Sequence, residues 1–344
     1  MKIQHINGKD YRLPGHQSPF QQTLYVHLIN WKWKHNIPEP GDYRGQEYDA
    51  ILPAAVTKDL PGIYGPVQQI LRQHHRKNPF RLHQHFNHMA SSQAANVNLF
   101  LPVLHHPAAN QILNRIKPDF VSLATDHLDH GYCLEFWGGN FGPDRSSRGP
   151  LGDKSGSHGT DSDIAIAYRN FAGELCLWLI EHKLSEREFT PCSGPGSKDR
   201  DKARHACTNA FAETLRNKHT CFHHDFRKRK YWEITESNRT LFVNHAKHAE
   251  CPFQGGMNQL WRNLLLALAL EQDEEQPYEH AAFSVVTHPA NRHLDASLKD
   301  FTDLVGGNPK FSVFTSEDVL RAAEALQDNN LAAWARWYRD LYML

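Results

Sequence analysis

The chain of 344 residues carries 38 Lys and Arg against 38 Asp and Glu, and 40% of its residues are apolar. It is long enough for one large domain or two modest ones, and its balanced charge excludes a global basic field as the means of attracting nucleic acid. The N-terminus lacks the apolar stretch of a signal peptide, and no segment reaches the roughly 18 apolar residues of a membrane span. We therefore expect a soluble, cytoplasmic protein that has no membrane partner and keeps its thiols reduced.

The first 120 residues predict a mostly helical region that packs on the core of a domain formed by residues 121–344. Residues 1–65 look irregular, because Pro, Gly and charged residues interrupt their apolar positions. Helical spacing of apolar residues then predicts three helices, at 63–73, 85–100 and 108–115.

Aromatic and β-branched content predicts a strand at 132–137, Y-C-L-E-F-W. Within it, Glu135 either faces solvent or is an additional acid for a metal site. A long loop rich in Gly and Ser follows at 138–160 and carries three cations, Arg145, Arg148 and Lys154. Long loops of this kind are often functional, so this one either closes on a DNA strand or is disordered.

Two apolar runs then predict a β-hairpin, on which the rest of the chain is organised. Ile164, Ile166 and Tyr168 fall on one face of the first run. The second run is apolar on both faces, which is typical of a strand in the centre of a sheet. Asn170 and Gly173 supply the backbone conformations that the connecting turn requires.

Acids stand at the tips of this hairpin. Asp163 begins the first strand, and Glu181 and Lys183 end the second with their side chains on one face. Two carboxylates at facing strand ends can hold Mg²⁺ or Mn²⁺, and a nearby ammonium can contact the metal-bound water or a phosphate, as phosphodiester hydrolysis requires. Asp161, two residues before Asp163 on the same face, is the alternative acid. The plainer interpretation of the E-x-K triplet is a salt bridge at a strand end.

This D…E-x-K pattern resembles that of the PD-(D/E)XK nucleases, the restriction-endonuclease-like superfamily. The resemblance implies an α/β fold with a mixed central sheet flanked by helices. It also implies that Asp163 and Glu181 are metal ligands, that the His182 backbone carbonyl is a further ligand, and that Lys183 is the catalytic lysine. Glu135 or Asp161 would complete the metal site.

A narrower resemblance concerns the string S-S-Q-A-A-N-V-N-L-F-L-P from Ser91 to Pro102 and the E-x-K-x-x-E run that ends at Glu186, with Cys192 after it. These features are similar to the PGN_0703-like branch of the superfamily, which would cover the chain from about Ala90 onward. A packed helix is the structural interpretation of the same string.

Four of the six cysteines lie in an insertion at about 190–255 that is also rich in Lys, Arg and His. Thiolates at this density suit Zn²⁺ or an iron–sulfur cluster, and some nucleases of the superfamily carry such a cluster, although the spacing here fits neither pattern. His205, His219 and His223 are substitute ligands, and free thiols are the alternative. The four candidates are Cys192, Cys207, Cys221 and Cys251.

Two further stretches are candidates for binding nucleic acid. A basic run is followed by Tyr231 and Trp232, which either stack on bases beside the bound phosphates or begin a structural element. A helix at 259–270 places Gln259, Arg262 and Asn263 on one face. Gln259 is similar to a glutamine that recombination exonucleases of the superfamily present to the active site, although a polar stripe on a buried helix is the structural alternative. The basic run consists of Arg227, Lys228, Arg229 and Lys230.

The remaining chain alternates strands and helices. Strands are expected at 281–287 and 310–315. Helices are expected at 294–304, directly after Ser316, which would cap its helix, and at 331–341. The sequence as a whole predicts a Mg²⁺-dependent deoxyribonuclease acting in restriction, defence or repair, with DNA as its partner and a homodimer as a further option. The alternative is a binding protein of nuclease-like fold that holds a cysteine-ligated metal and cuts nothing. A thiol hydrolase is poorly supported, because no cysteine has a recognisable nucleophile context.

Overall fold

The computed structural model describes residues 2–80, 82–83, 85–139, 149–153, 159–198, 207–274 and 277–344. Its centre is a six-stranded sheet in which the strand order is β10-β9-β8-β7-β5 and β6 also pairs with β7. The pairs formed by β7 are antiparallel, whereas β8, β9 and β10 run parallel, so the sheet is mixed as expected. The strands are β5 (Ser122–Leu123), β6 (Tyr132–Phe136), β7 (Ser162–Arg169), β8 (Leu175–Lys183), β9 (His280–Thr287) and β10 (Phe311–Thr315).

The predicted hairpin is confirmed as β7 and β8, with Ile164 opposite Ile180 and Arg169 opposite Leu175. Asn170 closes the turn, since its side-chain oxygen accepts from the backbone N–H of Ala172 and of Glu174. Alternate residues of β7 contribute to different cores: Ile164, Ile166 and Tyr168 to one, and Ala165 and Ala167 to the other. The sheet is therefore buried on both faces.

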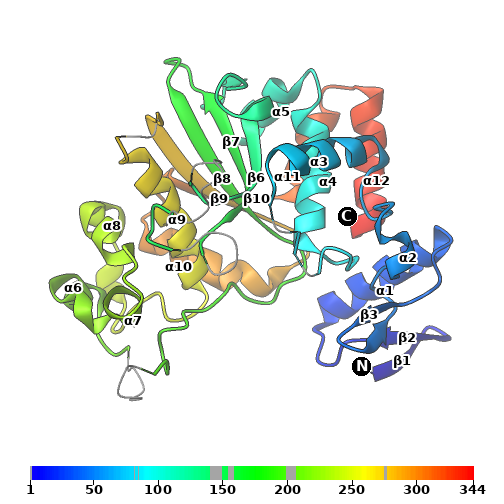
Figure 1. Ribbon diagram of the computed structural model, residues 1–344, viewed down its shortest axis with the longest axis horizontal. Helices are drawn as coiled ribbons and strands as arrows, with labels where there is room; N and C mark the ends of the chain where they lie inside the picture. The colour runs from blue at the N-terminus through cyan, green and yellow to red at the C-terminus, as the bar shows by residue number, and fades with distance from the viewer. Residues whose placement is uncertain are drawn as a thin grey trace.

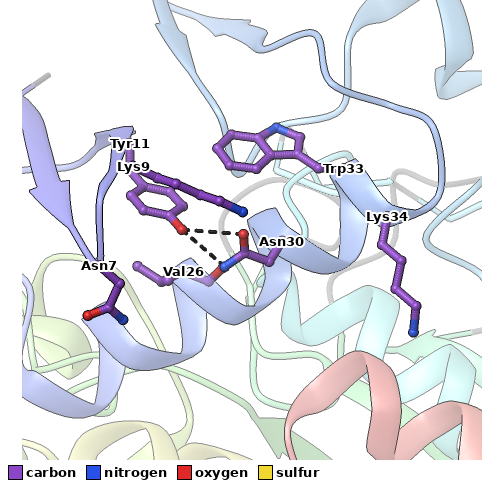
Figure 2. Close-up of a pocket in the computed structure, with 7 residues that line it drawn as sticks. All are labelled: Asn7, Lys9, Tyr11, Val26, Asn30, Trp33 and Lys34. Atoms are coloured by element: carbon purple, nitrogen blue, oxygen red, sulfur yellow. Dashed lines mark hydrogen bonds between the residues drawn. The ribbon is translucent and has the colours of Figure 1, made fainter.

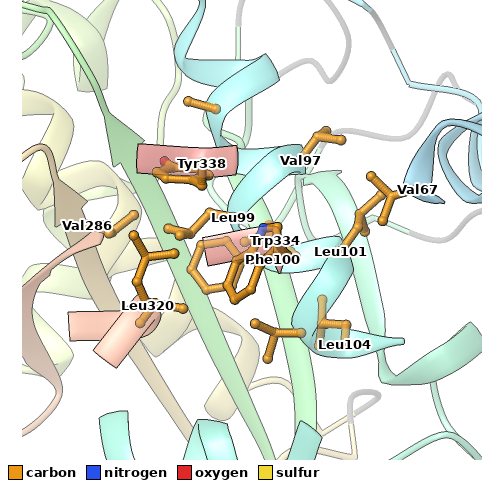
Figure 3. Packing of buried hydrophobic residues seen from close by; sticks show 14 of the residues in the cluster. Val67, Val97, Leu99, Phe100, Leu101, Leu104, Val286, Leu320, Trp334 and Tyr338 are labelled. Carbon is orange, nitrogen blue, oxygen red and sulfur yellow. The ribbon is translucent and has the colours of Figure 1, made fainter. Parts of the chain in front are cut away.

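Helices cover both faces of the sheet (Figure 1). One face packs against α4, whose residues Val97, Leu99, Phe100 and Leu101 lie in a core shared with α11 and α12 (Figure 3). The other face packs mainly against α9, with α10 beside it. These helices are α3 (Gly65–Lys77), α4 (Ser92–Leu104), α5 (Ala109–Ile116), α9 (Met257–Glu271), α10 (Asp295–Leu304), α11 (Ser316–Glu324) and α12 (Asn329–Tyr342).

Residues 1–65 are more regular than expected. They form two hairpins and a helix of 16 residues, α1, which share a small core made by Tyr11, Leu13, Ile29 and Ala50. The strands are short and mostly polar, which is why their sequence gave no alternation to detect. The elements are β1 (Lys2–Ile6), β2 (Lys9–Leu13), α1 (Pro19–Lys34), β3 (Gly41–Tyr43), β4 (Gln46–Tyr48) and α2 (Ala54–Thr57).

The insertion between β8 and α9 has little regular structure, with the short helices α6 (Phe211–Arg216), α7 (Phe222–Asp225) and α8 (Tyr231–Ser237) joined by turns. Its own core is aromatic. Phe253 stacks on Trp261 of α9 with ring centroids 3.9 Å apart, and Trp232 contacts both rings. This cluster packs the insertion against α9.

Two helix starts differ from the expectation. The helix expected at 85–100 begins at Ser92, after Ser91 caps it by accepting from the Ala94 N–H. Thr315, not Ser316, caps α11, because its hydroxyl accepts from the Asp318 N–H and the Asp318 carboxylate accepts from the Thr315 N–H. Both residues at 315 and 316 are good caps, so local chemistry did not distinguish them.

Candidate active site

The acids at the hairpin tips come together with the lysine. Oδ2 of Asp163 accepts from the His182 N–H at 2.6 Å, which ties the first acid to the second strand. Nζ of Lys183 lies 2.9 Å from Oε1 of Glu181, and both side chains are almost fully buried. The period of two along β8 is what puts these two side chains on one face.

Helix α9 holds the Glu181 carboxylate from the other side. Gln259 donates its Nε2 to Oε1 at 2.7 Å, and Asn263 donates its Nδ2 to Oε2 at 3.0 Å. The amide of Gln259 is itself oriented, because its oxygen accepts from the Thr190 N–H. The two donors are four residues apart and so lie on one face of the helix. Glu181 is thus fixed by three donors, one of which is the Lys183 ammonium.

Two more acids join this group. Burial, and then Asp161, raise the pKa of Glu135 to about 8, with Glu181 adding to the effect. Desolvation and then Glu181 raise the pKa of Asp161 to about 6. Burial, followed by Glu181 and Glu135, raises the pKa of Asp163 well above its usual value. Four carboxyl groups therefore repel one another at a single place, and a bound divalent cation would relieve that repulsion.

Glu135 is partly buried and does not simply face solvent, which was one of the two alternatives drawn from the sequence. Its neighbours Leu134 and Phe136 pair with Ile164 and Ser162, so Glu135 stands opposite Asp163 in the antiparallel register. Its φ of 51° is unusual for a residue other than glycine, and such strain often accompanies function. Gln93 of α4 hydrogen-bonds its carboxyl group.

Helix α4 also reaches Asp163. Asn96 donates its Nδ2 to the backbone carbonyl of Asp163 at 3.2 Å. Sequence reasoning did not assign this residue or Gln93 to the site. The signal was present, since Gln93 and Asn96 are polar residues three apart on a helix that is mostly apolar.

The lysine remains a cation in this environment. Burial alone would lower the pKa of Lys183, but the carboxylates of Glu181, Glu186 and Asp163 outweigh it and raise the pKa. His182 contributes only its main chain, because its imidazole is buried away from the acids and neither ring nitrogen has a partner among the described residues. Burial, with His288 and Lys183 adding, lowers the pKa of its ring to about 3.

The donor set fits a hard cation. All four acids offer oxygen, the ligand that Mg²⁺ and Mn²⁺ prefer. In the described part of the chain, no three His, Cys, Asp or Glu side chains are already spaced as ligands of one ion. The side chains of Asp163 and Glu181 are engaged by protein donors instead, so metal binding would exchange some of these hydrogen bonds for coordination.

The basic run lies at the surface of the insertion. Arg227, Lys228 and Lys230 are exposed, and Arg229 donates to the carbonyl of Gly152. Base stacking by the aromatic residues that follow is a wrong prediction, because Tyr231 is 3% exposed and Trp232 is 1% exposed. They pack in the aromatic core of the insertion instead and begin α8, which is the alternative that they start a structural element.

A hollow lies between the N-terminal hairpin and α1, far along the sequence from the acids (Figure 2). Tyr11 and Trp33 stack there at 5.3 Å, and the Tyr11 hydroxyl bonds to Asn30. Lys9 and Lys34 are the charged residues of its lining, which has no carboxylate. This hollow therefore lacks the carboxylates that gather at the ends of β7 and β8.

The other sequence candidates have the following places. Arg145, Arg148, Lys154 and His205 lie outside the described residues. Cys133 and Cys176 are core residues, as expected, and all six cysteines, which lie among the described residues, are free thiols. In the insertion, the sulfurs of Cys192 and Cys207 lie beside Gly194, and Cys221 and Cys251 interact electrostatically with them. No helix in the described ranges is both long and apolar enough to cross a membrane.

Comparison with curated proteins and with solved structures gives no significant match. A family comparison does match, over residues 28–343, and its description is restriction endonuclease associating with ARP. This match gives no support to the narrower PGN_0703-like assignment. Because it covers nearly the whole chain, including β7, β8 and α9, the protein belongs to the family of restriction endonucleases associating with ARP.

Proposed function

We propose that this protein is a PD-(D/E)XK nuclease that hydrolyses DNA phosphodiester bonds with Mg²⁺ or Mn²⁺. The observation that carries the proposal is the arrangement of Asp163, Glu181 and Lys183. Lys183 contacts Glu181, and Asp163 accepts a hydrogen bond from the N–H of His182, which lies between those two residues at the end of β8. A structural salt bridge at a strand end does not explain the additional carboxyl groups of Asp161 and Glu135, which gather at the same place against electrostatic repulsion.

Asp163 and Glu181 are the proposed metal ligands, with Asp161 or Glu135 completing the set and the His182 carbonyl as a further ligand. When bound, the cation supplies an activated water and neutralises charge on the phosphoryl oxygens. Lys183 remains a donor of three N–H groups beside Glu181, so its role is to bind a phosphate oxygen and stabilise the negative charge that develops in the transition state. Gln259 and Asn263 are positioning residues, because they act through Glu181.

Family membership supports a nuclease, and DNA is the substrate that the family description favours. The biological role that we propose is restriction, with defence and repair as related settings. Exposed cations at Arg227, Lys228 and Lys230 would bind the phosphate backbone, since no global basic charge is present to do so.

The test is cleavage of supercoiled and linear DNA by the purified protein with Mg²⁺, with Mn²⁺ and with EDTA. Glu181→Gln and Lys183→Met should each lower the cleavage rate by at least about 100-fold, because the first removes a proposed ligand of the cation and the second removes the positive charge beside the reacting phosphate. Glu188→Gln and Lys299→Ala are matched controls. Both residues are exposed, and these substitutions remove the same charges at positions away from the proposed site.

DNA that is bound but never cut by the unmodified protein would exclude a nuclease and favour the binding protein of nuclease-like fold. Cutting that persists in Glu181→Gln and Lys183→Met would show that the active site is elsewhere. Nicked circles as the first product would identify an endonuclease, whereas degradation of linear DNA alone would identify an exonuclease.

A further inference from the structure

Four cysteines reach one place from separate points of the chain. Cys192 follows β8, Cys207 and Cys221 lie within the insertion, and Cys251 precedes α9. All four are free thiols and all four are half-buried. The other two cysteines, 133 and 176, are fully buried between strands, which is the ordinary environment of a cysteine that acts as a small apolar residue. The insertion cysteines therefore need a different explanation.

Gly194 marks where two of these sulfurs meet. A Cβ placed on this glycine would stand 3.3 Å from Sγ of Cys192 and 3.6 Å from Sγ of Cys207. Two residues that are 15 positions apart thus direct their sulfurs toward one point. The absence of a side chain at Gly194 keeps that point open.

The other two thiols belong to the same group. Burial, followed by Cys192 and Cys221, raises the pKa of Cys207 to about 12. Burial also raises the pKa of Cys251 to about 12, and Cys221, Cys192 and Cys207 each add to the effect. Every insertion cysteine therefore lies near enough to another to interact electrostatically with it. Cys221 and Cys251 also pack against the core that contains α9.

Backbone N–H groups point at two of the sulfurs. The N–H of Gly194 donates to Sγ of Cys192 at 3.3 Å, and the N–H of Phe253 hydrogen-bonds the thiol of Cys251. In both cases the donor is two residues after the cysteine. Such donors stabilise a thiolate over a thiol and orient it, which is the role that outer-shell groups have around metal ligands.

Gln254 joins the segments that carry these cysteines. Its backbone carbonyl accepts from the Cys192 N–H at 3.0 Å, and its side-chain Nε2 donates to the Cys207 carbonyl. Gln254 is only three residues after Cys251. One glutamine therefore links three of the four cysteine segments, although the insertion has few regular elements to hold them otherwise.

We propose that Cys192, Cys207, Cys221 and Cys251 bind one Zn²⁺ ion as a tetrahedral set of thiolates. Among the described residues no three such side chains are already at the spacing of a metal site, so the sulfurs must draw together on binding. Each thiol gives its proton to solvent as its S–H bond is replaced by a Zn–S bond, and no electrons are transferred. Four thiolates favour Zn²⁺, which has no preference for another geometry and is stable at closed sites of this kind.

The site would fasten the insertion to the two elements that hold Glu181. Cys192 lies nine residues after Lys183, at the end of the segment that leaves β8, and Cys251 lies six residues before Met257, where α9 begins. Two residues before Cys192, the Thr190 N–H bonds to Gln259 of α9, which in turn bonds to Glu181. The inferred ion is structural, and it does not depend on the proposed nuclease activity.

The first experiment measures metal content in untagged protein that has been dialysed against EDTA to remove zinc from its 24 histidines. We expect one zinc per chain, and replacement by Co²⁺ should give the intense visible bands of a tetrahedral thiolate site. Titration with a mercurial reagent should release the zinc as four thiols react. Protein that is folded but free of zinc, or that contains iron with acid-labile sulfide, would overturn the proposal.

Single substitutions identify the ligands. Cys192→Ser, Cys207→Ser, Cys221→Ser and Cys251→Ser should each reduce retained zinc to near zero, whereas Cys133→Ala and Cys176→Ala should retain it. If a variant fails to fold, the mercurial titration of unmodified protein still decides, since it needs no substitution. Retention of zinc by all four serine variants would contradict the assignment.

Discussion

The side-chain amide of Gln259 and the carboxylate of Glu181 are joined by a 2.7 Å hydrogen bond between α9 and β8, and Asn263 makes a second bond to the same carboxylate. The helix thus fixes both oxygens of Glu181. Glu181 is a proposed metal ligand, and a ligand that can rotate binds its ion more weakly, so this pair should matter for activity even though neither amide would contact a reacting atom.

Asn263→Ala and Gln259→Ala should each lower cleavage by about 10-fold to 100-fold. The loss should appear as a weaker apparent affinity for Mg²⁺ and be partly rescued by high Mg²⁺ concentration, which a general loss of folding would not be. Gln272→Ala is the control, because it removes an amide from the end of the same helix that bonds only to Asn238 among the described residues. Equal losses in control and test variants would refute a positioning role.

Glu135 should make the stability of the metal-free protein depend on pH. Its pKa is raised from 4.5 to about 8 in the folded protein, so the folded state holds a proton that the unfolded state releases. The free energy of unfolding should therefore be highest at pH values below the pKa of Glu135 in the unfolded chain. It should fall as the pH rises through the pKa of Glu135 in the folded protein, by up to about 1.4 kcal/mol per pH unit for one proton.

Denaturant unfolding in EDTA at several pH values between these two pKa values checks this expectation. Glu135→Gln should flatten the dependence, because the amide cannot ionise, and added Mg²⁺ should also reduce it by neutralising the acids. An unchanged slope in Glu135→Gln would mean that another group titrates in this range.

The exposed cations of the basic run should contribute to DNA affinity through phosphates alone. Arg227→Ala, Lys228→Ala and Lys230→Ala should each weaken binding similarly for all sequences and reduce the slope of log affinity against log salt by about 1. Fluorescence anisotropy over a range of salt concentrations measures both quantities. Lys299→Ala should leave the slope unchanged, and the same result for the three test variants would remove the basic run from the interface.

Thr315 should stabilise the start of α11. Thr315→Ala should lower the free energy of unfolding by about 1 kcal/mol, since it removes the hydroxyl that accepts from the Asp318 N–H and donates to the Asp318 carboxylate. Thr315→Ser keeps the hydroxyl and should lose much less. Chemical denaturation compares the two, and equal losses would indicate that the methyl group, not the cap, is what contributes.

The hairpin at β7 and β8 was predictable because period-two burial, turn residues and terminal charges all agree over a short stretch of sequence. The pairing of Glu181 with Gln259 was partly predictable, since three polar residues share a face of an apolar helix. The position of Glu135 was not, because its side chain reaches Asp163 only through a backbone conformation that the sequence does not reveal. The density of cysteines in the insertion suggested that they converge, but their irregular spacing fits no known pattern, because their approach depends on long-range folding.

Helix α4 shows a further property of this fold. Three of its amides have specific partners: Gln93 bonds to Glu135, Asn96 to the Asp163 backbone, and Asn98 to Gly62 and Tyr342. The apolar residues of α4 would tolerate a helix that is rotated or shifted by a turn, but the amides would then be buried without partners, at a cost of about 1–3 kcal/mol each. These polar residues therefore favour one alignment of α4 on the sheet. The positions of the acids that α4 contacts depend on these specific hydrogen bonds and not on the amount of apolar surface that the helix buries.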